Sequence, residues 1–240
     1  MSVFRFKLFS VTSDLSAMKV NTDGVLLGAF AASGISSVPD SPLRVLDAGT
    51  GTGTIALMIA QKLATLTSGF EIIGVDSDAP SAEEAALNFA SSPWADHLHS
   101  ISAPFSSCIG EFWLIASNPP FFENALPAPR QRRSSARHVS TLSYRSLLDY
   151  AATHLCPNGS VCLILPADRQ SPLLHHALTL GFSPKRLTRV RTVEGKEPSR
   201  LMAEFTLGPS ACLETELSIH EDGGYSMDYR ALVHDYYLWA

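Results

Sequence analysis

The sequence predicts an α/β fold in which helices cover both faces of a mostly parallel β-sheet. Short apolar runs that are typical of buried strands alternate with longer helical stretches through the central part of the chain. A glycine-rich turn, residues 49–53, joins the first of these strands to an apolar helix. The 240 residues, 45% hydrophobic and 17% charged, suffice for one well-buried domain. We therefore expect a single domain over residues 1–240.

The first 42 residues precede the core of this domain, which we place at residues 43–240. Alternation over Phe4–Phe9 predicts a strand, and a turn at Ser13-Asp14 leads to a second strand over Ala17–Val20. A small apolar helix follows, for which Thr22 or Asp23 is the expected cap. These residues predict a hairpin and a short covering segment.

The glycine loop follows the first core strand, Leu43–Asp47, and precedes a helix over Thr54–Leu66. Strand, glycine loop and helix in this order favour nucleotide binding, because glycines let the backbone approach a ligand and the first helical N–H groups point at it. The loop reads Gly-x-Gly-x-Gly, which differs from the Gly-x-Gly-x-x-Gly of dinucleotide enzymes. Glycine loops also serve simple tight turns, so the loop alone does not decide.

The second core strand, Glu71–Asp76, ends in an acid. Asp76 follows the glycine loop at about the spacing from which a carboxylate reaches ribose hydroxyls. The alternative roles for Asp76 are a solvated acid or a cap for the helix over Ser81–Ala90. Asp78 is a second candidate for the ribose contact. A weaker strand is expected over His99–Ala103.

Asn118-Pro119-Pro120-Phe121 comes directly after the apolar strand Phe112–Ser117. This is where α/β enzymes place their chemistry, past the carboxyl end of a strand. The Asn118 side chain and the Pro119 backbone each offer a carbonyl oxygen, and the prolines have no N–H to compete for it. Phe121 adds a face for stacking. The four residues fit a planar group that carries an NH2, although a proline-capped strand end with a core Phe fits them equally well.

A long loop, residues 123–140, follows and is rich in basic side chains. A solvated lid and a phosphate-binding loop are the two interpretations, and its position beside the Asn-Pro-Pro-Phe motif favours the second. The basic residues of this loop are Arg130, Arg132, Arg133, Arg137 and His138.

The remaining chain predicts a helix, a buried strand, a helix, an antiparallel strand pair, a last strand and a C-terminal helix. In chain order these are residues 142–155, 160–165, 167–180, 185–193 with 200–207, 213–220, and 225–239. The antiparallel pair is basic, and an edge guarded by charge and an RNA contact surface are equally good interpretations. Aromatic residues of the C-terminal helix are expected to pack rather than stack on bases.

Overall charge and cysteine usage argue against several classes of protein, namely general nucleic-acid coats, disulfide-bonded secreted proteins and metal-binding proteins. The formal net charge of −5 argues against general coating of nucleic acid and leaves room for a local basic patch. The four cysteines form no Cys-x-x-Cys pair, which predicts buried reduced thiols in a cytoplasmic protein. We see no signal-peptide core, no bilayer-spanning run and no metal-ligand cluster.

Taken together, the glycine loop, Asp76 and the Asn-Pro-Pro-Phe motif resemble the class I S-adenosylmethionine-dependent methyltransferases that act on planar amino groups. The segment Met18–Gly28 is more specific. It is similar to bacterial tRNA (adenine-N6)-methyltransferases, which modify adenine 37 beside the anticodon of a valine tRNA. Ser92–Ala95, Ala136–His138 and Tyr229–Leu238 also resemble that family, so the resemblance covers essentially the whole chain.

This resemblance implies a Rossmann-like sheet of seven strands with one antiparallel strand, S-adenosylmethionine as cofactor, tRNA as substrate and no obligate protein partner. It assigns the amine site to Asn118, Pro119, Pro120 and Phe121, and RNA binding to the basic loop. The cofactor-binding residues that it implies are Lys19, Thr22, Asp23, Asp47, Gly49, Gly51, Gly53, Asp76 and Phe105. Many relatives have an Asp after the third strand, where this chain has Ala103-Pro104-Phe105. Backbone groups and Phe105 are therefore expected to hold the cofactor adenine.

The Asn-Pro-Pro-Phe motif is shared with guanine-N2 and glutamine-N5 methyltransferases, so methylation of another planar amine is the alternative. The glutamine enzymes carry an extra N-terminal helical domain, for which about forty residues are too few. A nicotinamide oxidoreductase is disfavoured by the glycine spacing. A non-catalytic RNA-binding protein is disfavoured by the intact motif.

Overall fold

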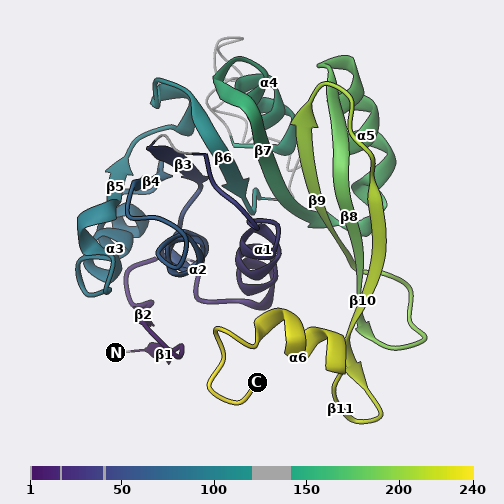
Figure 1. Cartoon of the computed structure of the whole chain (residues 1–240). Helices are drawn as coiled ribbons and strands as arrows, with labels where there is room; N and C mark the ends of the chain where they lie inside the picture. The colour runs from purple at the N-terminus through teal and green to yellow at the C-terminus, as the bar shows by residue number, and fades with distance from the viewer. Residues whose placement is uncertain (1, 17, 40–41, 121–141) are drawn as a thin grey trace, which may run out of the picture.

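The computed structural model describes residues 2–16, 18–39, 42–120 and 142–240. Within them, one nine-stranded sheet has the order β11-β10-β8-β9-β7-β6-β3-β4-β5 (Figure 1). The strands are β3 (Leu43–Ala48), β4 (Phe70–Asp76), β5 (Leu98–Ser102), β6 (Phe112–Ser117), β7 (Leu155–Pro166), β8 (Phe182–Val193), β9 (Arg200–Leu207), β10 (Leu213–Glu221) and β11 (Gly224–Tyr225).

The five strands from β5 to β7 pair in parallel, and β9 runs antiparallel between β7 and β8. This confirms the α/β class and the antiparallel strand. The expected count of seven strands is exceeded, because β10 pairs in parallel with β8 and β11 folds back on β10. The additional strands extend the sheet at the edge that lies far from the glycine loop (Figure 1).

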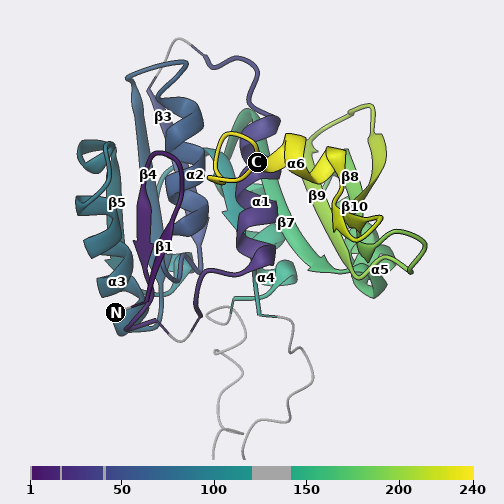
Figure 2. The same cartoon turned by 90° about the horizontal axis from the view of Figure 1, so that it is seen from below.

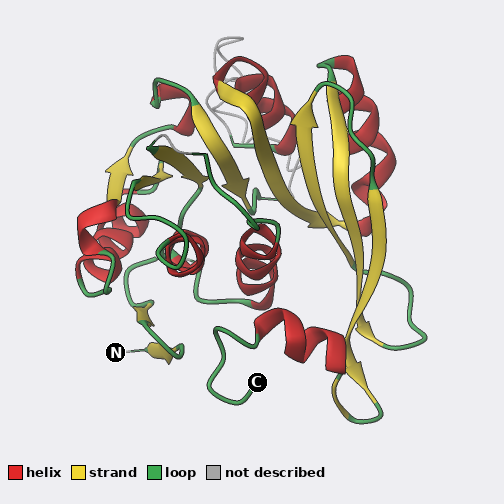
Figure 3. Cartoon of the chain, in the orientation of Figure 1, coloured by secondary structure: helices red, strands yellow, loops and turns green. Residues whose placement is uncertain are grey.

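Helices cover both faces of the sheet (Figure 3). One buried apolar cluster joins the sheet to α1, α2 and α3, and a second joins the opposite face to α4 and α5. The helices are α1 (Thr22–Ser33), α2 (Thr54–Leu63), α3 (Ala79–Ala90), α4 (Tyr144–His154), α5 (Gln170–Thr179) and α6 (Met227–Val233), with 3-10 turns at Ala95–His97, Phe105–Ser107 and Ala167–Arg169. Among the described residues, no helix combines the length and apolarity that a bilayer crossing requires.

The parallel register brings three loops to one edge of the sheet. Asp47 of β3 lies beside Gly74 of β4 and beside Ala116 of β6. Three segments therefore lie together at the carboxyl ends of the parallel strands: the glycine loop after β3, Asp76 at the end of β4 and Asn118 after β6.

The N-terminal hairpin is present, but its second strand was predicted in the wrong place. It consists of β1 (Val3–Arg5) and β2 (Ser10–Thr12), and residues 18–20 are not a strand. The cap of α1 was also predicted wrongly, because the Asn21 side-chain oxygen accepts the hydrogen bond from the Gly24 N–H at 2.9 Å. Neither Thr22 nor Asp23 is the N-cap residue.

The C-terminal helix is shorter than predicted, because α6 ends at Val233. Beyond it, the expected aromatic packing is confirmed. Tyr237 stacks on Phe6 with ring centroids 5.9 Å apart, and Trp239 stacks on Tyr225 at 4.2 Å. The Lys7 N–H also donates to the Tyr236 carbonyl at 2.8 Å. The N-terminal hairpin and the C-terminal tail therefore pack together on the face of the sheet that α1 and α2 cover (Figure 2).

All four cysteines are free thiols. Cys108 and Cys162 are buried, as predicted, whereas Cys212 is exposed and Cys156 is partly exposed. The prediction of buried thiols is therefore correct for two of the four.

Candidate active site

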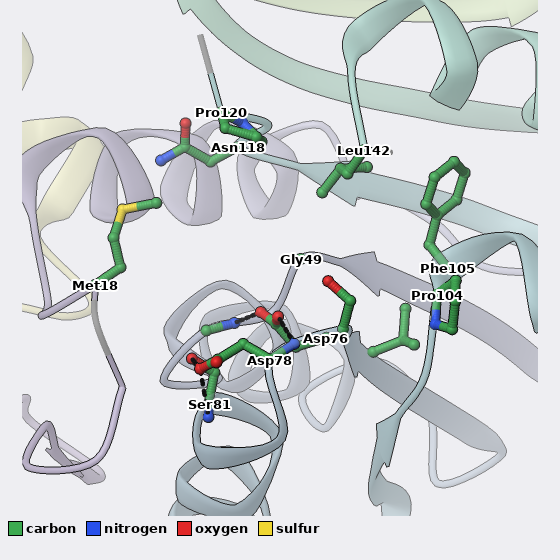
Figure 4. Close-up of a pocket in the computed structure, with 13 residues that line it drawn as sticks. Met18, Gly49, Asp76, Asp78, Ser81, Pro104, Phe105, Asn118, Pro120 and Leu142 are labelled. Atoms are coloured by element: carbon green, nitrogen blue, oxygen red, sulfur yellow. Dashed lines mark hydrogen bonds between the residues drawn. The ribbon is translucent and has the colours of Figure 1, made fainter. Parts of the chain in front are cut away.

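A cavity of about 410 Å³ opens where the three loops converge (Figure 4). Its walls combine the glycine loop, the end of β4, the start of α3, the turn after β5 and the residues after β6. The lining residues are Met18, Gly49, Gly51, Val75, Asp76, Ser77, Asp78, Ser81, Pro104, Phe105, Asn118, Pro120 and Leu142. Among these described residues, Asp76 and Asp78 contribute two carboxylates, and none is a Lys or an Arg.

The glycine loop has the backbone that its sequence predicts. Gly49, Gly51 and Gly53 have φ values of 75°, 55° and 81°, which side-chain-bearing residues rarely adopt. A Cβ on Gly49 would lie 2.5 Å from a Leu142 methyl carbon, and one on Gly53 would lie 2.5 Å from the Phe89 ring. Gly49 and Gly51 line the cavity. Gly53 lies at the N-terminus of α2 and lines neither this cavity nor a smaller one that adjoins it.

Asp76 connects the end of β4 to the glycine loop. One carboxylate oxygen accepts from the Gly51 N–H at 3.0 Å, and the other accepts from the Asp78 N–H at 2.9 Å. Its carboxylate also lines the cavity, where ribose hydroxyls would donate to it. The cap of α3 is Asp78, which accepts from the Ser81 N–H at 3.1 Å and from its hydroxyl at 2.7 Å.

Asp47 lies beneath the loop and does not line the cavity. Its side chain is fully buried and accepts from the Thr50 hydroxyl at 2.7 Å and from the Ala56 N–H at 3.2 Å. Burial, opposed in part by these hydrogen bonds, raises the pKa of Asp47 to about 7. Its second oxygen has no hydrogen-bond partner in the described part of the chain. Asp47 therefore supports the loop from below.

The opposite wall presents the residues expected to bind the amine. Asn118 and Pro120 follow β6 and line the cavity, while Pro119 is buried and does not. The strand end is fixed by Ser117, whose buried hydroxyl donates to the Ala48 carbonyl at 2.7 Å. Phe121 and the five basic loop residues lie outside the described residues.

The turn after β5 forms a third wall. Phe105 is 4% exposed, lines the cavity beside Pro104 and packs edge-on against Tyr150 at 5.5 Å. Figure 4 shows Met18 and Phe105 on opposite sides of the cavity, with Asn118 on the β6 side. Pro104 and Phe105 therefore give this wall an apolar surface.

The segment that follows the N-terminal hairpin contributes Met18 to this cavity and Lys19 to an adjoining cavity of about 40 Å³. Thr22 and Asp23 line neither. The Asp23 carboxylate instead accepts from the Arg200 guanidinium at 2.8 Å, so α1 is tied to the start of β9.

The basic strands β8 and β9 are largely neutralised within the chain. The buried Glu204 carboxylate forms ion pairs with Lys185 at 2.8 Å and with Arg186 at 2.5 Å. Three further arginines pair with acids at 2.7–3.0 Å: Arg189 with Glu214, Arg191 with Glu216 and Arg200 with Asp23. These contacts favour a structural role for the charges over an RNA contact surface.

Several lining residues were not predicted from the sequence. Met18, Ser81, Pro104 and Leu142 reach the cavity from four different elements. The sequence could have predicted the position of Leu142, because this residue follows the basic loop that starts after the Asn-Pro-Pro-Phe motif. The others carry no chemical group that would have distinguished them from ordinary packing or turn residues.

The cavity fits S-adenosylmethionine. Asp76 offers acceptors for ribose hydroxyls, Phe105 offers an apolar face for the adenine, and the absence of a side chain at Gly49 lets the loop backbone lie close to Leu142. Among the described lining residues the charged groups are the carboxylates of Asp76 and Asp78, which suit a ligand that carries a sulfonium and an ammonium group.

Comparison with known proteins gives the same class. The chain is 39% identical to a tRNA1(Val) (adenine(37)-N6)-methyltransferase of Porphyromonas gingivalis, over 98% of this chain and 94% of that protein. It is 38% identical to the protein of that name from Photobacterium profundum, over 98% of each chain. A predicted O-methyltransferase of Agrobacterium tumefaciens has the same fold, with a TM-score of 0.64, 16% identity, and coverage of 89% of this chain and 96% of that one. No protein-family model matches.

These identities over nearly the full length of both chains exceed what a shared fold alone produces. The motif order predicted from the sequence and the cavity in which those motifs meet agree with them. The chain belongs to the tRNA1(Val) (adenine(37)-N6)-methyltransferase family.

Proposed function

We propose that this protein transfers the methyl group of S-adenosylmethionine to the N6 amine of adenine 37 in a valine tRNA. The observation that carries the proposal is that Asn118 lines the same cavity as Asp76 and the glycine loop. An amine-binding group and a nucleotide-binding loop at one cavity are what a methyl transfer to a base requires.

The cofactor would be held by the three walls of the cavity. Asp76 would accept hydrogen bonds from the ribose hydroxyls, and Phe105 would pack on the adenine. Gly49 and Gly51 would let the loop backbone lie close to the cofactor. Lys19 in the adjoining cavity is suited to a carboxylate group. S-adenosylmethionine supplies an electrophilic methyl group when bound.

The amine would be activated by orientation alone. The lone pair of an exocyclic adenine nitrogen is delocalised into the ring, so the nitrogen is a poor nucleophile. A hydrogen bond from the NH2 to the Asn118 side-chain oxygen favours a tetrahedral nitrogen with its lone pair directed at the methyl group. The proposed second acceptor is the backbone carbonyl of Pro119, a buried residue between the lining residues Asn118 and Pro120. Neither group is a strong base, so the methylated nitrogen releases its extra proton to water after the transfer.

The substrate base must leave its stack to enter the cavity. Phe121 is the proposed stacking partner for the unstacked adenine, and Pro120 completes the motif. Arg130, Arg132, Arg133, Arg137 and His138 are proposed to contact tRNA phosphates. The intramolecular pairing of the basic residues on β8 and β9 leaves this loop as the better candidate for that role. Such a reaction belongs in the cytoplasm, where tRNA is found.

One assay tests the proposal directly. The protein is incubated with methyl-labelled S-adenosylmethionine and total tRNA from a strain that lacks the enzyme, and the labelled nucleotide is mapped. We expect N6-methyladenosine at position 37 of a valine tRNA. Label in guanine N2 of rRNA, or in a protein glutamine supplied in parallel, would assign the same motif to another planar amine.

A further inference from the structure

Glu84 of α3 is a buried carboxylate whose partners all lie in the N-terminal segment. It is 1% exposed and accepts from three consecutive backbone N–H groups, those of Asp14 at 2.5 Å, Leu15 at 3.0 Å and Ser16 at 2.7 Å. Successive amides directed at one point form a concave anion site, and a buried charge is tolerated only with such partners. This carboxylate therefore fixes the backbone of residues 14–16.

Asn88, one helical turn further along α3, makes a second attachment. Its side-chain oxygen accepts from the Thr12 N–H at 2.9 Å. Its amide NH2 donates to the Thr12 carbonyl at 3.0 Å and to the Thr52 carbonyl at 2.9 Å. Because residues four apart share one face of a helix, Asn88 and Glu84 act together. Asn88 also ties the N-terminal segment to the glycine loop.

The attached residues continue into a wall of the cofactor cavity. We call residues 12–16 and 18–20 the cover segment. The Ser16 hydroxyl donates to the Met18 carbonyl at 3.1 Å and lies 3.0 Å from the Ser81 hydroxyl. Met18 and Ser81 both line the cavity. The position of Met18 over the cavity thus depends on contacts that begin at Glu84.

We propose that Glu84 and Asn88 are positioning residues that hold the cover segment over the cofactor cavity and thereby set the affinity for S-adenosylmethionine. This inference rests on the proposed function, in which that cofactor occupies the cavity. Neither side chain lines the cavity, so each acts through the cover segment. With the segment fixed beforehand, cofactor binding does not have to order it.

Glu84→Gln removes the charge and places an NH2 among three N–H donors. The cover segment then loses its anchor, and cofactor binding must supply the ordering. Asp76 and Asn118 are untouched, so a saturated enzyme keeps its chemistry. We expect the dissociation constant and the KM for S-adenosylmethionine to rise about tenfold, the change that loss of one charge-assisted hydrogen bond produces. The kcat and the KM for tRNA should stay within about twofold.

The experiment is calorimetric titration of the full chain with S-adenosylmethionine, combined with steady-state kinetics on tRNA. The matched control is Glu83→Gln, which removes the same charge from the adjacent, exposed position of α3. Hydrogen exchange at amides 14–16 gives a direct readout. Exchange should be faster in Glu84→Gln without ligand and should slow again with saturating S-adenosylmethionine. An unchanged pattern would leave the cover segment independent of Glu84 and overturn the proposal.

Ser16→Ala is the second variant, for use where Glu84→Gln fails to fold, because it leaves Glu84 in place and removes only the links to Met18 and Ser81. We expect a severalfold weaker affinity from it, again with kcat preserved. Unchanged affinity in the folded variants, or a lower kcat with an unchanged KM, would overturn the proposal. A wild-type protein that does not bind S-adenosylmethionine would instead overturn the proposed function.

Discussion

The Ser117 hydroxyl donates a 2.7 Å hydrogen bond to the carbonyl oxygen of Ala48. Ser117 is the last residue before Asn118, and Ala48 is the last residue before Gly49. The bond therefore fixes Asn118, the residue proposed to bind the amine, relative to the glycine loop, because it joins the ends of the paired strands β6 and β3. Methyl transfer depends strongly on the relative position of the two reacting groups, whereas binding of the cofactor alone or of the base alone does not.

Ser117→Ala should lower kcat about tenfold, because small misplacements of reacting groups slow oriented reactions strongly. The dissociation constant for S-adenosylmethionine should change by less than about twofold. The control is Ser100→Ala, which removes a comparable bond from the Ser100 hydroxyl to the Ala82 carbonyl (2.6 Å), two residues that do not line the cavity. Single-turnover kinetics measure the chemical step. Equal losses in both variants would make the Ser117 effect a general one.

Asn118→Ala should abolish methyl transfer while largely sparing cofactor binding, because the side chain is proposed to touch the amine and not the cofactor. Asn118→Asp keeps an acceptor oxygen and should retain part of the activity. Label incorporation into tRNA and calorimetric titration separate the two effects. Methylation at the normal rate by the alanine variant would contradict the mechanism.

Stability should depend on pH through Asp47. Burial raises the pKa of Asp47 from 3.8 to about 7, so the folded state holds a proton that the unfolded state has released between these values. The free energy of unfolding should therefore fall as pH rises from about 4 to about 7, by on the order of a few kcal/mol, and then level off. Denaturant titrations across this range measure it.

Asp47→Asn is neutral at every pH and should remove that dependence. Asp96→Asn, at an exposed position, is the control and should leave it in place. A pH profile that is the same in wild type and Asp47→Asn would place the titrating group elsewhere.

Replacing Arg132 and Arg133 with Ala should weaken tRNA binding and reduce its salt dependence by about one unit of slope for each arginine that contacts a phosphate. Cofactor affinity should not change. Arg191→Ala is the matched control, because Arg191 is already paired with Glu216 at 2.7 Å. Binding is measured by fluorescence titration at several salt concentrations. Unchanged tRNA affinity in the double variant would identify the loop as a solvated lid.

The sequence by itself determined the class of fold and several of the residues that line the cavity. Buried strands, a glycine loop and an acid at a strand end are local patterns, and parallel pairing places their ends together whatever the details of packing. Asp76, Gly49, Gly51, Phe105 and Asn118 were all predicted and all line the cavity.

Only the tertiary structure decided how distant segments are joined. Asp23 pairs with Arg200, 177 residues away, and the Asp14 N–H donates to Glu84, 70 residues away. The first contact directs the Asp23 carboxylate to β9, and the second attaches the chain that follows the hairpin to α3. Hydrogen bonds between residues far apart in sequence depend on how helices pack on the sheet, and no local pattern encodes that packing.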